Sequence, residues 1–557
     1  MATQKIFDFH FHLLFKHILM KDLPLDEDIK VRGVGAVLDE LSGGAFDSQS
    51  SPNLLSQSQV FVGVTSLLAV EHAFAHKILE VYGVSFRFLL GHLDNDMFDE
   101  IKNGKRIHYE EFKRQLDFYL ASKPALAAAP YNIEYLQRSA QWKNKSLEDI
   151  VKILSGGTKR FLALSIEGGH NLSNVHIRSE TERSRNPELQ LEEIQNRKDV
   201  DIMSLNLCHL SYIPEQHLSG FAQGLNKSAQ KIFQSKDFTP TTGLGITQLG
   251  KQVIRQALTH QTKPILIDVK HMSVYSRFQF YRYRDKLISE NQNVKRLPII
   301  SSHTGLTFIG MKEYVTKKLF LTNEYSCGVK KFYQITPENR IIGESNDRRN
   351  NDLFANPWSI GLFDEEITEI MMSKGMIGIS MDQRVLGAVK TILDGERKKY
   401  YEVEYVPDGE WKKLFIDGVF PTAEEGFIQK IFGLTPRPER HAMLLCLHLV
   451  HAVRIGNETL GWVENTSPWD HLCIGSDFDG LINPLNHYEN VTHLHKLADD
   501  LFEYLPVADK YISSGSSKAL KYNADGSVNS DYLKKVIADV LFNNGVKFTA
   551  RYLRNWE

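Results

Sequence analysis

In five places along this chain, an apolar run meets a histidine or a carboxylate residue. These places span residues 8–12, 166–170, 267–271, 299–303 and 474–480. Histidine and carboxylate are the usual ligands of a hydrolytic divalent ion, and barrel enzymes carry their chemistry at the carboxyl ends of strands. One such place would mean little, but five in series predict a barrel whose strand ends converge on a cation.

Short β-branched runs alternate with helical patterns along the chain. Apolar residues at helical spacing predict helices at 248–259, 365–372 and 440–454. Hydrophobic strands that alternate with helices are typical of a parallel sheet covered by helices. About eight such units predict an α/β protein with a (β/α)8 TIM-type barrel. The candidate strands span residues 5–9, 60–64, 161–166, 202–207, 264–269, 298–301, 376–380 and 471–475.

Two stretches do not fit this alternation, at about 305–347 and about 384–438. We expect a single catalytic barrel over residues 1–557, with both stretches as insertions. Because they would leave the barrel near strand ends, they could shape the rim of the site or make an oligomer contact, as in a homodimer. A solvated elaboration with neither role is the alternative.

The charge balance gives no reason to expect nucleic acid or an anionic membrane as a partner. The chain has 66 basic and 68 acidic residues, for a formal net charge of -2. It contains no run of about eighteen uncharged apolar residues, so we expect no transmembrane helix. The four cysteines form no CxxC pair and the N-terminus carries no secretion signal, which favours a cytoplasmic protein.

His10 and His12 are separated by one residue. On a strand, side chains at i and i+2 leave the same face, so both imidazoles can point into the barrel mouth and share one ion. Phe9 and Phe11 would then face the helices. The alternative, a histidine pair packed in a core strand, would require buried hydrogen-bond partners for both rings.

Glu167 follows an apolar run and precedes two glycines. Its two carboxylate oxygens could bridge two cations, and the glycines permit a sharp turn at the strand end. A structural glutamate satisfied by backbone amides is the alternative. We expect His170, beyond the glycines, to support the site or form a turn rather than to bind metal.

His271 and His303 each end a strand-like run and would supply nitrogen ligands to a second ion. The alternative for either one is a hydrogen-bonded structural histidine. Asp477 closes the last strand, where a carboxylate can accept and return a proton during hydrolysis. Asp479 is its rival at i+2; we favour Asp477 because it is nearer the strand end, and a capping role would explain Asp479.

At these positions the chain resembles the membrane dipeptidase (renal dipeptidase) family, within the amidohydrolase superfamily of metal-dependent (β/α)8 hydrolases. The most specific matches are Glu-Gly-Gly-His at 167–170 and Gly-Ser-Asp-Phe-Asp-Gly at 475–480. The matching segments occur in the family's order. They span residues 165–170, 205–209, 243–247, 267–273, 298–303, 348–352, 375–379, 448–451 and 475–480.

The resemblance implies two divalent metal ions, with zinc as the expected metal. Glu167 would bridge the two ions, His10 and His12 would complete the shell of the first, and His271 and His303 would hold the second. Asp477 would handle the proton of a metal-bridging hydroxide.

The resemblance also implies two residues that contact the substrate. His209 matches a histidine that would polarise the scissile carbonyl or steady the oxyanion. Arg349 matches the arginine that would receive the substrate's carboxylate, for which a guanidinium offers a bidentate fork.

The chain departs from the family in three respects. His12 stands where the family usually places Asp, which makes the site more positive and leaves dipeptide specificity open. The connection between His303 and Arg349 is longer than in the family. The chain is also larger than a typical member and begins at the barrel, without a secretion signal.

We therefore expect a metal-dependent hydrolase that cleaves the amide bond of a small carboxylate-bearing substrate, most simply a dipeptide. One alternative keeps the metal site but acts on a lactone, a cyclic amide or a deaminase-type substrate. Another is a non-catalytic barrel stabilised by metal.

Overall fold

The computed structural model describes most of the chain, with gaps. The described residues are 4–20, 23–30, 46–72, 75, 93–174, 187–213, 216–222, 245–317, 320–327, 330–337, 340–344, 352–356, 358–387, 404–407, 410, 437–459, 466–512 and 518–556.

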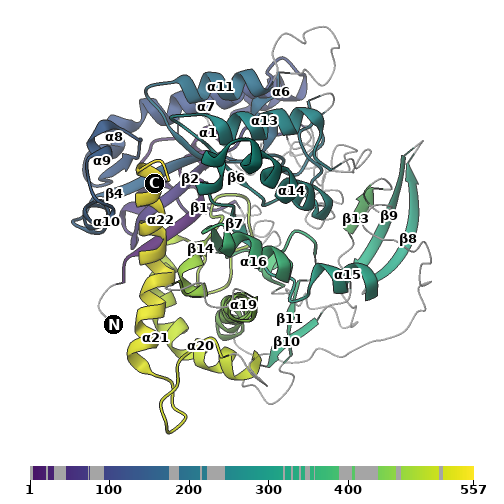
Figure 1. The fold of residues 1–557 in the computed structure, drawn as a ribbon. Coiled ribbons are helices and arrows are strands. Elements are labelled where there is room, and N and C mark those ends of the chain that lie inside the picture. Colours follow the sequence, from purple (N-terminus) through teal and green to yellow (C-terminus); the bar gives the residue numbers. More distant parts are fainter. Residues whose placement is uncertain are drawn as a thin grey trace.

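Eight parallel strands form a closed barrel at the centre of the molecule (Figure 1). Neighbouring strands pair in the order β2, β1, β14, β12, β7, β6, β5, β4, and a pairing between β2 and β4 closes the ring. Each strand overlaps one of the eight predicted strands, so the predicted (β/α)8 barrel is confirmed. The strands are β1 (Ile6–Phe11), β2 (Val60–Leu67), β4 (Arg160–Ile166), β5 (Ile202–Asn206), β6 (Leu266–Asp268), β7 (Ile300–Thr304), β12 (Met376–Ser380) and β14 (Leu472–Gly475). A further strand, β3 (Ile133–Tyr135), pairs in parallel with the start of β4.

Helices surround the barrel (Figure 1). The three predicted helices are present as α13, α16 and α19. The helices are α1 (Phe15–Leu19), α3 (Pro52–Ser56), α6 (Asn95–Lys102), α7 (His108–Ala121), α8 (Lys123–Ala127), α9 (Ala140–Lys143), α10 (Leu147–Ser155), α11 (Pro187–Asn196), α13 (Gln248–Thr259), α14 (Val274–Glu290), α15 (Met311–Lys317), α16 (Asp364–Met372), α17 (Gln383–Leu386), α19 (Arg437–Thr459), α20 (Leu497–Ile512), α21 (Ser530–Ala538) and α22 (Asn544–Leu553).

Helix α13 shows why these sequences form helices against the barrel. Thr247 caps its start, because the side-chain oxygen accepts a hydrogen bond from the backbone N–H of Gly250 at 3.0 Å. Val253, Ile254, Ala257 and Leu258 form one buried face. The cap and the apolar stripe together fix where the helix begins and which side packs inward.

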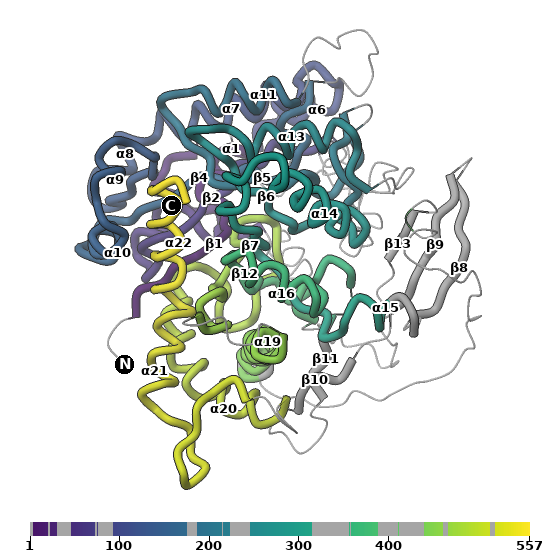
Figure 2. Tube along the Cα trace, viewed as in Figure 1, coloured from purple at the N-terminus to yellow at the C-terminus, as the bar shows by residue number. Residues whose placement is uncertain are grey.

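Side chains of the first strand, β1, point alternately toward the surrounding helices and into the barrel. Phe9 of β1 packs edge-on against Phe548 of α22, with the ring centroids 5.5 Å apart. The N-terminal strand and the C-terminal helix therefore lie side by side (Figure 2). Because successive side chains leave opposite faces of a strand, His10 points to the other side, into the barrel.

The two insertions share one sheet. Strands β8 (Phe320–Cys327) and β9 (Lys330–Pro337) of the first insertion pair with each other, and β13 (Glu404–Pro407) of the second pairs antiparallel with β9. Strands β10 (Arg340–Glu344) and β11 (Asp352–Ala355) form a separate antiparallel pair. No pattern in the sequence indicated that these distant stretches meet.

Among the described residues, none of the helices combines the length and the apolar character that crossing a bilayer requires.

Candidate metal centre

The predicted metal-binding residues meet at the carboxyl ends of the barrel strands. His10 lies on β1 and His303 on β7, whereas Glu167 directly follows β4. His271 comes three residues after the end of β6, and Asp477 comes two residues after the end of β14. Parallel strands bring all their carboxyl ends to one edge, so residues far apart in sequence converge there.

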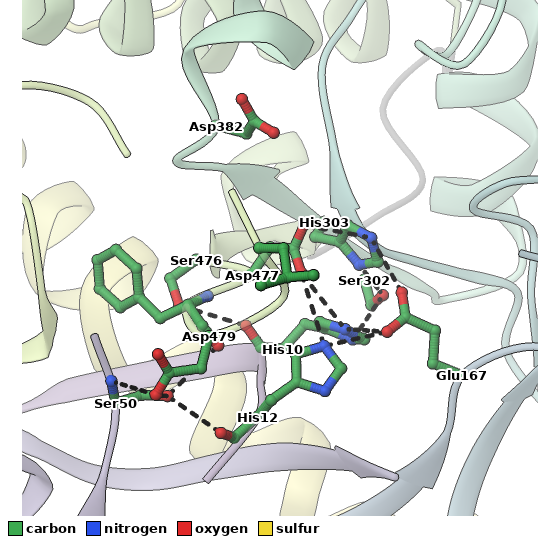
Figure 3. A network of polar contacts seen from close by, with 12 residues as sticks. His10, His12, Ser50, Glu167, Ser302, His303, Asp382, Ser476, Asp477 and Asp479 are labelled. Atoms are coloured by element: carbon green, nitrogen blue, oxygen red, sulfur yellow. Dashed lines mark hydrogen bonds and ion pairs between the residues drawn. The ribbon is translucent and has the colours of Figure 1, made fainter. Parts of the chain in front are cut away.

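The carboxylate of Glu167 is the centre of the cluster, and its two oxygens face different partners. Oε2 lies 3.4 Å from Nε2 of His10 and 3.0 Å from Nε2 of His12. Oε1 lies 3.0 Å from Nε2 of His271 and 3.5 Å from Nε2 of His303. Glu167 therefore lies between two pairs of imidazole nitrogens, and Figure 3 shows its carboxylate beside His10, His12 and His303.

Ser302 orients two of these rings. Its hydroxyl oxygen lies 3.2 Å from Nδ1 of His10 and 2.8 Å from Nδ1 of His303. The backbone N–H of Ser302 donates a hydrogen bond to Oδ1 of Asp268 at 3.2 Å, and Asp268 is buried. An oxygen that accepts from both Nδ1–H groups leaves both Nε2 atoms with free lone pairs for a cation. Asp268 thus lies behind the candidate ligands.

Asp477 and Asp479 have different surroundings although they are two residues apart. Oδ1 of Asp477 lies 3.9 Å from Nε2 of His10 and 3.7 Å from Nε2 of His12, and Oδ2 lies 3.9 Å from Nε2 of His303. Asp479 instead forms an ion pair with Lys16 at 2.7 Å and accepts hydrogen bonds from the backbone N–H of Ser50. The backbone N–H of Gln49 donates a second hydrogen bond to Asp479, and Figure 3 shows the carboxylate of Asp479 turned toward Ser50, away from Glu167.

The donor atoms of the centre are of the kinds, and lie close enough together, to hold a metal ion. Nε2 of His10 and Nε2 of His12 are buried and, apart from their ion-pair contacts with Glu167 and Asp477, have no hydrogen-bond partner among the described residues. Buried polar atoms are normally paired, so these nitrogens point to a missing partner. Ligand atoms of His10, His12, Glu167 and Asp477 all lie within 4.8 Å of one another, and those of Glu167, His209 and His271 form a second such group. Imidazole and carboxylate donors suit zinc and similar divalent ions.

The charges of the centre follow from its burial and its contacts. Burial opposes the ionisation of Glu167, but His10, His12 and His271 outweigh it and hold the pKa of Glu167 well below its usual range. Burial and the charge of Glu167 raise the pKa of Asp477. Without a cation, the two acids therefore differ in how readily they ionise.

The backbone is strained at two of the strand ends. His271 has a φ of 69° and Asp477 has a φ of 64°, both in the left-handed region that non-glycine residues rarely adopt. Gly168 has a φ of 91°, and a Cβ there would lie 2.4 Å from Nδ1 of His170, so only glycine fits. Such strain is often found where a fold must aim a side chain at a functional site.

Comparison with known proteins gives matches only among solved structures. No protein-family profile matches the chain, and no curated protein matches it. The chain is similar to a dipeptidase described as a metallopeptidase, with 12% identity, a TM-score of 0.44 and coverage of 100% of this chain and 99% of that chain. A probable dipeptidase from Pseudomonas aeruginosa matches with 12% identity, a TM-score of 0.43 and coverage of 100% and 96%. A metallopeptidase from Rhodobacter sphaeroides, liganded with a phosphinate mimic of the dipeptide L-Ala-D-Ala, matches with 12% identity, a TM-score of 0.40 and coverage of 98% and 99%.

Of the two residues predicted to contact the substrate, the structure describes only His209. His209 follows β5, and its Nε2 lies 3.9 Å from Oε1 of Glu167. Its ring centroid is 4.6 Å from that of His271. The structure therefore brings His209 to the edge of the cluster. Arg349 lies outside the described residues.

Sequence reasoning missed three residues beside the centre. Ser302 directly precedes a predicted ligand, and that position was the only signal for it. Glu71 lies against His209 and His170, with Oε1 3.4 Å and 3.9 Å from their Nδ1 atoms. Lys270 directly precedes His271, and its Nζ atom is buried without a hydrogen-bond partner among the described residues. Burial lowers the pKa of Lys270 to about 8 despite the attraction of nearby carboxylates, of which Asp477 acts most strongly.

Proposed function

We propose that this protein is a metal-dependent hydrolase that holds two divalent ions, with zinc as the expected metal. Its substrate would be a small molecule with a free carboxylate, most simply a dipeptide, cleaved at the amide bond. The observation that carries this proposal is the position of Glu167, whose two oxygens each face a separate pair of imidazole nitrogens.

In this proposal each side of the centre has its own ligands. His10 and His12 would hold the first ion, His271 and His303 the second, and Glu167 would contact both. Bound divalent ions would supply Lewis acidity, which polarises a carbonyl and makes water a stronger acid. Ser302 would keep the rings of His10 and His303 aimed at the ions through their Nδ1 atoms.

The proton in this reaction would move through Asp477. Its side chain is 13% exposed, whereas that of Glu167 is 2% exposed, so Asp477 lies nearer to where water and substrate arrive. We assign Asp477 to accept a proton from the attacking water and return it to the leaving amine. His209 would contact the scissile carbonyl through Nε2, and Arg349 would receive the carboxylate of the substrate.

His12 keeps a second substrate class open. A neutral imidazole at this position gives the centre one negative charge fewer than a carboxylate would. A more positive centre suits the same hydrolytic chemistry on a lactone or a cyclic amide, or a deaminase-type reaction. Hydrolysis of these substrates would use the same metal ligands of the protein, so the same test should include them.

The test combines a metal count with a substrate panel. We expect two zinc ions per chain by elemental analysis, and hydrolysis of dipeptides, including those with a D-configured C-terminal residue. The Glu167→Gln variant should lose turnover and bound metal but keep its fold. Glu148→Gln, at an exposed site on α10, is the matched control and should behave as wild type. Turnover of only lactones or cyclic amides would contradict the dipeptide assignment. A metal-loaded protein without any turnover would instead indicate a non-catalytic barrel.

A further inference from the structure

Glu71 and His209 come from different loops and meet beside the metal centre. Glu71 lies four residues beyond the end of β2, and His209 lies three residues beyond the end of β5. One oxygen of Glu71, Oε1, is 3.4 Å from Nδ1 of His209. The Glu71 side chain is buried, so water does not compete for this contact.

The same oxygen of Glu71 also holds the backbone next to His209. It accepts hydrogen bonds from the backbone N–H groups of Leu210 and Ser211, each at 3.2 Å. These bonds fix the carboxylate relative to the loop that carries His209. The contact with the imidazole is therefore made by a group that cannot turn freely.

The two nitrogens of the His209 ring face opposite partners. Nδ1 faces Glu71, whereas Nε2 lies 3.9 Å from Oε1 of Glu167. The ring is also packed against His271, with the centroids 4.6 Å apart. A carboxylate at Nδ1 selects the orientation that leaves Nε2 for the reacting side of the site.

His170 does not compete for this role. Its Nε2 lies 2.9 Å from the carbonyl oxygen of Ala69, and its Nδ1 is 3.9 Å from Oε1 of Glu71. The backbone contact already satisfies one ring nitrogen of His170, and the other is farther from Glu71 than that of His209. His170 thus packs beside Glu71, whereas His209 makes the closer contact with its carboxylate.

We propose that Glu71 is the positioning residue of His209: its carboxylate pairs with Nδ1 of His209 at 3.4 Å and directs Nε2 at the substrate carbonyl. This inference rests on the proposed function for the role of His209, but the contact itself can be tested without turnover. Glu71 would act only through His209, and it would contact neither substrate nor metal.

The experiment compares Glu71→Gln with Glu111→Gln. Glutamine keeps the length of Glu71 and an oxygen that can accept from Leu210 and Ser211, but it removes the charge that faces His209. Glu111 is also a buried carboxylate, and it pairs with Arg106 at 3.0 Å, so its variant controls for the loss of a buried ion pair. The first readout is the pair of imidazole ¹⁵N resonances of His209 in histidine-labelled protein, assigned with His209→Ala. We expect them to shift in Glu71→Gln and to stay in place in Glu111→Gln, whereas unmoved resonances in Glu71→Gln would overturn the proposal.

The second readout is a double-mutant cycle on zinc-loaded protein. Residues that support an active-site group typically contribute about 10- to 100-fold. Glu71→Gln should therefore lower kcat by about this factor with KM and zinc content unchanged, and it should cause no further loss in a His209→Ala background. Equal losses in both backgrounds would overturn the proposal. If wild type shows no hydrolysis, the proposed function fails, and the resonances of His209 alone decide the role of Glu71.

Discussion

Nε2 of His271 lies 3.1 Å from Nε2 of His303. Without a bound cation, two neutral imidazoles can approach in this way only if one of these nitrogens carries a proton and the other accepts it. Nδ1 of His303 already contacts Ser302 at 2.8 Å, which favours a free lone pair on its Nε2. A cation that both lone pairs can bind is the simplest partner for this arrangement.

This geometry predicts that divalent metal stabilises the folded protein. A ligand that binds only the folded state at 100 times its Kd adds about 2.7 kcal/mol, so zinc should raise the melting temperature of chelator-treated protein by several degrees. Thermal unfolding followed by circular dichroism measures the shift. The His303→Ala variant should lose most of it, whereas His493→Ala, on the 3-10 helix Val491–Lys496, should retain it. Equal melting temperatures for wild type with and without zinc would contradict the prediction.

The contrasting surroundings of Asp477 and Asp479 predict different defects in their asparagine variants. Asp477→Asn should lower kcat by about 10²- to 10⁴-fold, the usual contribution of a general base, with little change in stability. Asp479→Asn breaks a buried ion pair with Lys16, so it should lower the free energy of unfolding by about 3–5 kcal/mol.

Steady-state kinetics and urea unfolding of both variants separate the two effects. Each variant is the control for the other, because the chemical change is the same and the positions are two residues apart. A large loss of kcat in folded Asp479→Asn, with Asp477→Asn fully active, would reverse the assignment.

The strands and the convergence of the candidate ligands could be predicted because both depend on local pattern. Apolar runs of strand length mark the barrel, and the i, i+2 spacing of His10 and His12 places them on one face wherever the strand lies. The order of parallel strands then brings Glu167, His271 and His303 to the same edge without further information.

The rest of the site depends on contacts that no local pattern encodes. Glu71 reaches His209 through a loop after β2, and nothing in its neighbouring residues marks that contact. The ion pair between Asp479 and Lys16 requires the first and last barrel strands to be adjacent, as they are in the closed sheet. Asp and His adopt the left-handed backbone more often than most non-glycine residues, but no local pattern predicts it at His271 and Asp477.

His12 predicts a change in metal affinity. Its side chain is fully buried, and Nε2 lies 3.0 Å from Oε2 of Glu167. In His12→Asp, a negative charge would replace a neutral ligand in a site shielded from solvent, so both ions should be held more tightly. We expect Kd to fall about tenfold, which corresponds to about 1.4 kcal/mol, as measured by competition with a chromophoric chelator. His495→Asp makes the same substitution at an exposed position and should leave Kd unchanged. An unaltered Kd in His12→Asp would remove His12 from the ligand set.

Acid should destabilise this protein through the protonation of His448, a histidine that is not one of the candidate metal ligands. His448 is fully buried on α19; its Nδ1 accepts a hydrogen bond from the backbone N–H of Leu306 at 3.0 Å, and its Nε2 lies 3.3 Å from the carbonyl oxygen of Leu386. Burial lowers the pKa of His448 from 6.5 to about 3. The unfolded chain therefore binds more protons than the folded one between these values. The contribution of His448 to stability is complete above about pH 6.5 and declines as the pH falls toward 3.

The test compares wild type with His448→Gln in metal-free protein, so that metal ligands do not add their own protonation. Glutamine can accept from Leu306 and donate to Leu386 without titrating, so it retains both bonds at any pH. Between pH 7 and pH 4.5, the free energy of unfolding of wild type should fall by about 2–3 kcal/mol more than that of the variant, because two pKa units correspond to about 2.7 kcal/mol. Urea unfolding at the two pH values measures this difference. Parallel losses in the two proteins would mean that other groups, such as the buried His108 and the partly buried His217, account for the acid sensitivity, since desolvation also lowers their pKa values, to about 3 and about 4.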